Sequence, residues 1–202
     1  SLSAADWIGH RYGPSSWEVE DYYLRLDGYL NTFLGFLDRA VGADRYVIAL
    51  SSDHGVTPFP EQLAGQGATA YRLRYDSLIS ALNGMGAKVA SDMGLPASPL
   101  AVKDGEPLVD YAIAERQGVS AKSLDSALAV SIRALPYVAD LFTRNELMQA
   151  AGSDRPYEER FRHVYHEQRG PDLYLRLNEF ILVTNDSTGA SHGTPYTDDA
   201  NV

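Results

Sequence analysis

Residues 45–55, RYVIALSSDHG, combine a short apolar run with polar residues and a glycine. The run from Arg45 to Leu50 contains β-branched residues and has no interruption, which is typical of a strand buried on both faces of a mainly parallel sheet. In open α/β sheets, ligands bind beyond the carboxyl ends of the strands. Since Asp53 and His54 follow the run directly, the sequence predicts them at such an edge. The position alone fits equally well an Asp53 that caps a turn and a His54 that packs against the sheet.

The segment before this run predicts a long amphipathic helix. Ser15 and Glu18 have the spacing of a capping box, and Gly42 marks the expected end of the helix. Apolar residues recur between them at helical spacing: Val19, Tyr22, Tyr23, Leu26, Leu30, Phe33, Leu34, Leu37 and Val41. A helix followed by a buried strand indicates an α/β fold.

The rest of the chain alternates breaks with further elements. Glycine and proline break the stretch of residues 84–105. A helix is predicted from Ser120 to Ala134 and a strand from Tyr137 to Phe142. Residues 172–177 alternate polar and apolar side chains, as a strand with one solvated face does, and residues 180–184 are expected to continue the sheet.

The composition excludes several classes of partner and site. The 202 residues, 45% of them hydrophobic and 22% charged, predict one globular domain. A net charge of −10 argues against non-specific binding to nucleic acid or to an anionic membrane surface. No apolar run approaches the roughly 18 residues that a membrane-spanning helix needs. Because the chain has no cysteine, any metal ion must be bound by histidine, aspartate or glutamate.

Two further segments carry residues that can bind metals. Asp6 and His10 lie four residues apart, so one oxygen and one nitrogen ligand can reach a single zinc ion, although this spacing alone is more often a surface turn. His192 lies between small residues in SHGTPY, where a solvent-exposed loop histidine is the simpler interpretation. Together with Asp53 and His54, these residues place two aspartates and three histidines at the ends of α/β elements, enough for more than one divalent ion.

The same segments resemble the alkaline phosphatase superfamily. The resemblance is carried by DWIGHRYGP at residues 6–14, SDHG at 52–55 and HGTPY at 192–196, in the order that the family has them. It is nearest to the bacterial PafA-type phosphatases, close to the nucleotide pyrophosphatases and phosphodiesterases. It implies an α/β/α sandwich with a mainly parallel sheet, of which this chain is the C-terminal part, incomplete at its N-terminal side. The resemblance is thin through residues 85–165, which we interpret as an insertion.

Residue by residue, the resemblance implies a centre with two zinc ions, for which other divalent metals can substitute. Asp6, His10 and His192 are expected to bind one ion, and Asp53 with His54 the other. The implied reaction is hydrolysis of a phosphate monoester or diester, with a Ser or Thr hydroxyl as the nucleophile. In the family, this nucleophile and a further Asp ligand precede the Asp-x-x-x-His motif, and only five residues precede Asp6 here. The nucleophile is therefore expected to be absent, and the chain alone inactive.

Two groups of alternatives remain open at this point. The first keeps the fold but changes the chemistry to that of a phosphonate hydrolase, a sulfatase or a phosphomutase. The second is a non-catalytic module with a structural metal ion, which four protein ligands normally close. His163 and His166 are expected to lie on a solvated basic face. The resemblance further implies a small-molecule phosphate ester as substrate and a periplasmic or secreted location, whereas the oligomeric state is left undefined.

Overall fold

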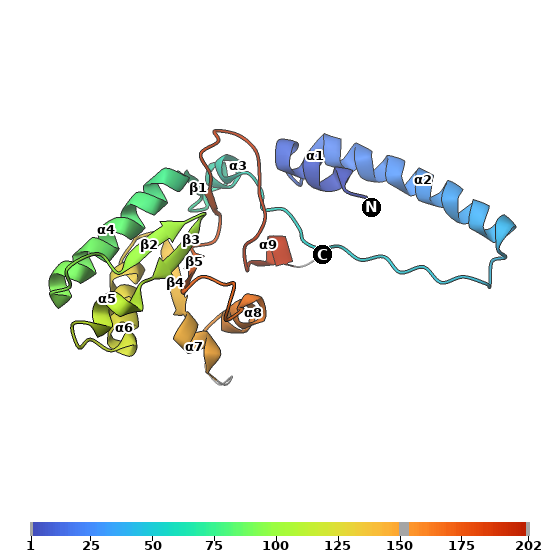
Figure 1. The fold of residues 1–202 in the computed structure, drawn as a ribbon. Coiled ribbons are helices and arrows are strands. Elements are labelled where there is room, and N and C mark those ends of the chain that lie inside the picture. Colours follow the sequence, from blue (N-terminus) through green and yellow to red (C-terminus); the bar gives the residue numbers. More distant parts are fainter. Residues whose placement is uncertain (1, 150–153, 201–202) are drawn as a thin grey trace. The chain divides into compact units, whose positions relative to one another are not determined.

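The computed structural model describes residues 2–149 and 154–200, which divide into two compact units (Figure 1). Unit 1 comprises residues 1–71 and 186–202, and unit 2 comprises residues 72–185. The predicted insertion at about 85–165 lies inside unit 2, which is wider than that prediction. None of the helices among the described residues is long and apolar enough to span a membrane.

Helices dominate the described part of unit 1: α1 (Ala4–Tyr12), α2 (Trp17–Ala40), α3 (Pro60–Gly65) and α9 (Thr197–Ala200). The predicted long helix is confirmed as α2, but its cap is Ser16 and not Ser15. The Ser16 hydroxyl accepts the backbone N–H of Val19 at 3.2 Å. This bond satisfies one of the N–H groups that a helix start leaves without an intrahelical partner.

The predicted strand at residues 45–50 does not form. In the described part of the chain these residues belong to no strand pair, and the segment runs as an extended coil after α2 (Figure 1). The Val47 side chain is 95% exposed, although the pattern predicted burial on both faces. A strand is stabilised by hydrogen bonds to a neighbouring strand, and no described segment supplies one here.

Unit 2 contains most of the strands and a sequence of shorter helices. Its elements are β1 (Tyr71–Leu73), which begins at the last residue of unit 1, α4 (Tyr75–Met93), β2 (Leu100–Lys103), β3 (Glu106–Val109), α5 (Tyr111–Glu115), α6 (Ala121–Arg133), β4 (Val138–Thr143), α7 (Arg144–Met148), α8 (Glu158–Val164), β5 (Leu173–Leu177) and β6 (Ile181–Val183). The predicted helix at 120–134 and the strands at 137–142, 172–177 and 180–184 are thereby confirmed within one or two residues.

The strands of the described residues form three separate two-stranded sheets, β1 with β6, β2 with β3 and β4 with β5. The β2–β3 and β4–β5 pairs are antiparallel, with Leu100 opposite Val109 and Phe142 opposite Tyr174. The chain is therefore mixed α/β, as predicted. Its sheets are small, and the single mainly parallel sheet of the prediction is not formed within the described residues.

The break predicted for residues 84–105 does not begin at Gly84, because α4 continues through Gly84 and Gly86 to Met93. Gly86 is required by packing, not by a break in the helix. A Cβ atom at this position would lie 2.8 Å from the Leu100 Cβ and 2.5 Å from the Ser98 Oγ. The glycine thus lets α4 approach β2 closely, and Gly94 with φ +67° then ends the helix.

The apolar core of unit 2 lies between α4, α6 and the sheets. Its fully buried members include Leu124, Leu128, Ile132 and Leu141. The first three lie on α6 at helical spacing, so one face of that helix packs into the core. A smaller cluster is formed by Phe142, Leu147 and Tyr174.

Candidate metal centre

The predicted ligands come from three segments of unit 1. Asp6 and His10 lie on α1, one turn apart on the same helix face. Asp53 and His54 lie in the coil between α2 and α3, and His192 lies in the loop that precedes α9. Gly13, with φ +87°, ends α1 three residues after His10.

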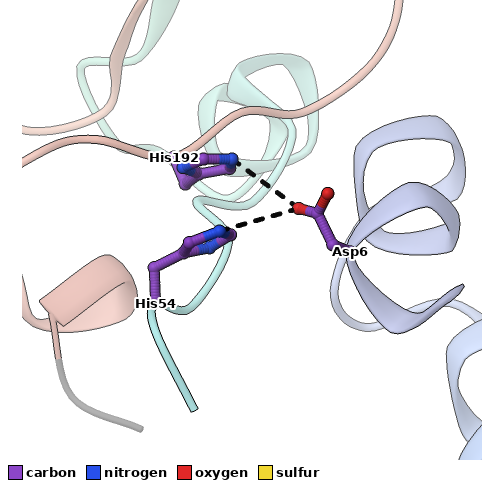
Figure 2. A group of neighbouring side chains, drawn as sticks. All are labelled: Asp6, His54 and His192. Atoms are coloured by element: carbon purple, nitrogen blue, oxygen red, sulfur yellow. Dashed lines mark ion pairs between the residues drawn. The ribbon is translucent and has the colours of Figure 1, made fainter. Parts of the chain in front are cut away.

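Three histidine rings converge on one oxygen of Asp6. The Asp6 Oδ1 atom lies 3.4 Å from His10 Nε2, 3.9 Å from His54 Nε2 and 3.6 Å from His192 Nε2. Figure 2 shows the His54 and His192 rings, from different loops, pointing toward this carboxylate. Within the described residues, ligand atoms of Asp6, His54 and His192 lie within 4.8 Å of one another, close enough to bind one metal ion. The chain thus brings His192 back to the α1 pair.

Backbone contacts hold the three segments together. The amide of Ala190 donates to the carbonyl of His10 at 2.7 Å, and the amide of Thr57 donates to the carbonyl of Ser191 at 3.0 Å. The loop before His192 is therefore bonded on one side to α1 and on the other to the segment that follows His54. These backbone hydrogen bonds bring the ligand side chains of the three segments together.

The hydrogen bonds of two rings fix which nitrogen can bind a cation. His10 Nδ1 lies 2.7 Å from the Ala190 carbonyl oxygen, and His54 Nδ1 lies 2.8 Å from the Gly55 carbonyl oxygen. A carbonyl oxygen only accepts, so each Nδ1 carries the hydrogen. In the neutral rings, the lone pair is then on Nε2, the atom that faces Asp6. This is how metal-binding histidines are usually oriented by their surroundings.

The electrostatics of the cluster favour a positive charge. The hydrogen bond to the Gly55 carbonyl raises the pKa of His54 above its ordinary value, partial burial opposes this effect, and the carboxylates of Asp53, Asp6 and Asp199 raise the pKa further. The Asp6 Oδ1 atom is buried and accepts no hydrogen bond from the described residues. A buried carboxylate oxygen without a donor, facing three imidazole nitrogens, fits a divalent cation as its missing partner.

Two predicted site residues differ in how firmly they are held. The His54 ring stacks on the His192 ring, with centroids 3.5 Å apart and an interplanar angle of 14°. Asp53 is 89% exposed, and its Oδ2 lies 3.8 Å from His54 Nε2. It therefore lies at the rim of the cluster, where its carboxylate is open to solvent. The assignment of these ligands to two separate ions stays a prediction.

One residue at the site was not found by sequence reasoning. Asp199 is buried on α9, and its carboxylate accepts the amide of Thr194, two residues after His192. No spacing pattern marks it, because its partners are backbone groups. By contrast, His163 and His166 belong to unit 2 and are not part of this cluster.

Comparisons with known proteins agree with the motifs. The model of the family type I phosphodiesterase / nucleotide pyrophosphatase matches residues 1–193. Among curated proteins, the chain is 28% identical over 212 residues to the alkaline phosphatase PhoK of a Sphingomonas species and 29% identical over 205 residues to a protein of Myroides odoratus named calcium-transporting ATPase. Both alignments cover 100% of this chain, but only 37% and 36% of the respective relatives.

Other matches are shorter or structural. The alkaline phosphatase PafA of Elizabethkingia meningoseptica is 51% identical over 55 residues, which are 27% of this chain and 10% of that protein. The crystal structure of wild-type PafA superposes with a TM-score of 0.75 at 23% identity, over 97% of this chain and 36% of that one. This likeness shows that the mixed α/β fold is PafA-like. With a family match over nearly its whole length, the chain belongs to the type I phosphodiesterase / nucleotide pyrophosphatase family.

Proposed function

We propose that this chain supplies most of the metal ligands of a two-metal centre that hydrolyses phosphate esters. The observation that carries the proposal is the convergence of His10, His54 and His192 Nε2 atoms on Asp6 Oδ1, at 3.4–3.9 Å. Nitrogen and oxygen ligands suit zinc, and other divalent metals can bind the same set. The alkaline phosphatase names of several relatives and the description of the family support phosphate monoesters or diesters as substrates.

Each residue has a defined part in this proposal. Asp6, His10 and His192 hold one ion, and Asp53 with His54 holds the other. When bound, two such ions supply positive charge to the attacking and departing oxygens of an in-line displacement. The chain's own contribution is to orient the ligands, and the carbonyl groups of Ala190 and Gly55 do so by fixing the ring nitrogens of His10 and His54.

The proposal concerns a longer protein of which this chain is one part. The chain spans 36% and 37% of the two curated relatives reported above that it matches over its whole length. We place the Ser or Thr nucleophile outside these 202 residues, in the part of the relatives that precedes the Asp-x-x-x-His motif. We likewise propose that the other strands of a mainly parallel sheet lie there, and that the protein acts outside the cytoplasm on small phosphate esters.

Kinetics of the full-length protein test the proposal. We expect Asp53→Ala and His54→Ala each to lower kcat/KM for a chromogenic aryl phosphate by at least about 1,000-fold, or roughly 4 kcal/mol, because cation charge stabilises mainly the transition state. His163→Ala is the matched control, since this histidine is exposed in unit 2, and it should leave the rate unchanged. Near-normal rates in both ligand variants would refute the proposal. Turnover by the 202-residue chain alone would contradict the placement of the nucleophile.

A further inference from the structure

One buried residue is bonded to both of the loops that carry His54 and His192. Asp199 on α9 is only 3% exposed. Its carboxylate accepts the backbone N–H of Thr194, which follows His192 by two residues. Its own carbonyl oxygen accepts the backbone N–H of Gly55, the residue directly after His54, at 2.7 Å. Two ligand loops from distant parts of the sequence therefore meet at one residue.

The contact with the His54 loop tolerates only glycine. A Cβ atom at Gly55 would lie 2.2 Å from the carbonyl oxygen of Asp198 and 3.4 Å from the Asp199 Cα. The first distance is far inside van der Waals contact, so any side chain there would push α9 away from the loop. The absence of a Cβ is what allows the Gly55 amide to reach the Asp199 carbonyl.

The contact with the His192 loop closes a short turn. The amide of Asp199 donates to the carbonyl of Tyr196 at 3.2 Å, and Tyr196 is itself buried. The turn from Thr194 to Asp199 is thus fixed at both ends, by the carboxylate at Thr194 and by the backbone at Tyr196. This turn begins two residues after His192, whose ring stacks on that of His54.

These contacts act on the relative position of two rings. His54 and His192 lie on separate loops, and their Nε2 atoms lie 3.9 and 3.6 Å from the same Asp6 oxygen. Each of the two proposed ions needs its ligand nitrogen at roughly 2 Å, and the two ions must lie a fixed distance apart, so a change in the spacing of the loops would weaken cation binding. Outer residues that orient metal ligands typically contribute about 10- to 100-fold to metal affinity.

We infer that Asp199 is a positioning residue that holds the His54 and His192 loops at the spacing that cation binding needs. In this role it orients the two loops and is not itself a ligand. The inference rests on the proposed function, because it assumes that the cluster binds a metal ion. It goes beyond that function by assigning a role to a residue outside the ligand set.

Cobalt binding to the full 202-residue chain tests the inference, because Co²⁺ reports both affinity and ligand geometry through its visible absorption. We expect Asp199→Ala to weaken Co²⁺ binding by about 10- to 100-fold and to change the spectrum at saturation. Asp199→Asn keeps an oxygen that accepts the Thr194 amide and should restore most of the affinity. Asp198→Ala is the matched control, since this neighbouring carboxylate is exposed on the same helix, and it should bind as the unsubstituted chain does.

A second variant approaches the same contact from the other loop. Gly55→Ala leaves the Asp199 carboxylate in place but forces Asp198 away, so it should also weaken Co²⁺ binding and alter the spectrum. Circular dichroism of each variant shows whether it folds. If Asp199→Ala does not fold, Gly55→Ala takes its place, and we expect Gly55→Ala to bind Co²⁺ more weakly than Asp199→Asn does.

Three results would overturn the inference. The first is Co²⁺ affinity within twofold of the unsubstituted chain, with an unchanged spectrum, in folded Asp199→Ala or, failing that, in folded Gly55→Ala. The second is an equal loss in Asp198→Ala, which would indicate a general effect of charge near the site. The third is an unsubstituted chain that binds no Co²⁺, which would remove the cation binding on which this inference rests, while the kinetics of the full-length protein test the proposed centre separately. The first two results would leave the proposed function intact.

Discussion

The two units of the chain are stabilised in different ways. In unit 2, α6 places Leu124, Leu128 and Ile132 in a fully buried core. In unit 1, the 24-residue α2 has no buried residue, and Tyr29 on it is 70% exposed. Unit 1 is instead connected by backbone bonds around the candidate metal centre, such as that from Ala190 to His10. The comparison shows that the order of the site depends on a few polar contacts, whereas unit 2 depends on apolar burial.

The largest effect on stability is therefore expected in the core of unit 2. Leu128→Ala should lower the free energy of unfolding of this unit by about 2–5 kcal/mol, because it removes buried methyl groups and leaves a cavity. Val130→Ala is the matched control, since Val130 lies on the same helix with an exposed side chain, and it should cost less than about 1 kcal/mol. Urea unfolding measures both. Equal losses would contradict the claim that one face of α6 holds the core.

A smaller effect is expected at a partly buried ion-pair network in the same unit. Arg155 donates to Asp140 at 2.7 Å and to Glu146 at 2.8 Å, and Arg133 donates to Asp140 at 3.0 Å. Burial by itself raises the pKa of Asp140. The hydrogen bonds from Arg155 and Leu141 and the charges of Arg155 and Arg133 lower it by more, so the pKa lies below its ordinary value.

The pH dependence follows from this direction. Because the folded-state pKa is below the unfolded value of about 3.9, the Asp140 carboxylate stabilises the fold fully above that pH. The contribution is lost as the pH falls through the folded-state pKa. Asp140→Asn should cost roughly 1.5–3 kcal/mol at neutral pH and make unfolding less sensitive to pH below about 4. Urea unfolding at a series of pH values measures this, and an unchanged acid dependence would contradict the assigned role.

The smallest effect is expected on the exposed face of α2. Tyr29→Ala removes a large aromatic ring, yet it should change the stability of the 202-residue chain by no more than about 0.5 kcal/mol, because the ring is mostly in solvent. Thermal unfolding followed by circular dichroism measures the change. A loss of 2 kcal/mol or more would show that this face is packed, and the contrast between the two units would then fail.

The elements of unit 2 that the sequence predicted correctly find their stabilising contacts within that unit. Ser120 caps α6 by accepting the amide of Ser123 at 3.2 Å, a contact within one turn. The predicted strand at 137–142 pairs with the predicted strand at 172–177, so each of these two strands has a hydrogen-bonded neighbour within unit 2. Residues 45–50 carry an equally clear strand pattern but have no described partner. Periodicity indicates which faces can be buried, but it does not supply the neighbour.

The candidate site shows the same distinction. Asp6, His10, His54 and His192 are residue types that bind metals, so their motifs were visible in the sequence. Asp199 was not, because its role depends on backbone groups of Thr194 and Gly55 that only the fold brings to it. Motifs identify ligands by their chemistry, whereas the residues that position ligands are identified by contacts.

The most direct test of the account is the location of zinc in crystals of the full-length protein, measured by anomalous diffraction at the zinc edge. We expect one peak at about 2.0–2.2 Å from ligand atoms of Asp6, His10 and His192. We expect a second peak, at an ion bound by Asp53 and His54, about 4 Å from the first. Crystals in which α1 and the loop of His192 are ordered but zinc is absent from these side chains, or bound elsewhere, would show that these residues do not form a two-zinc centre.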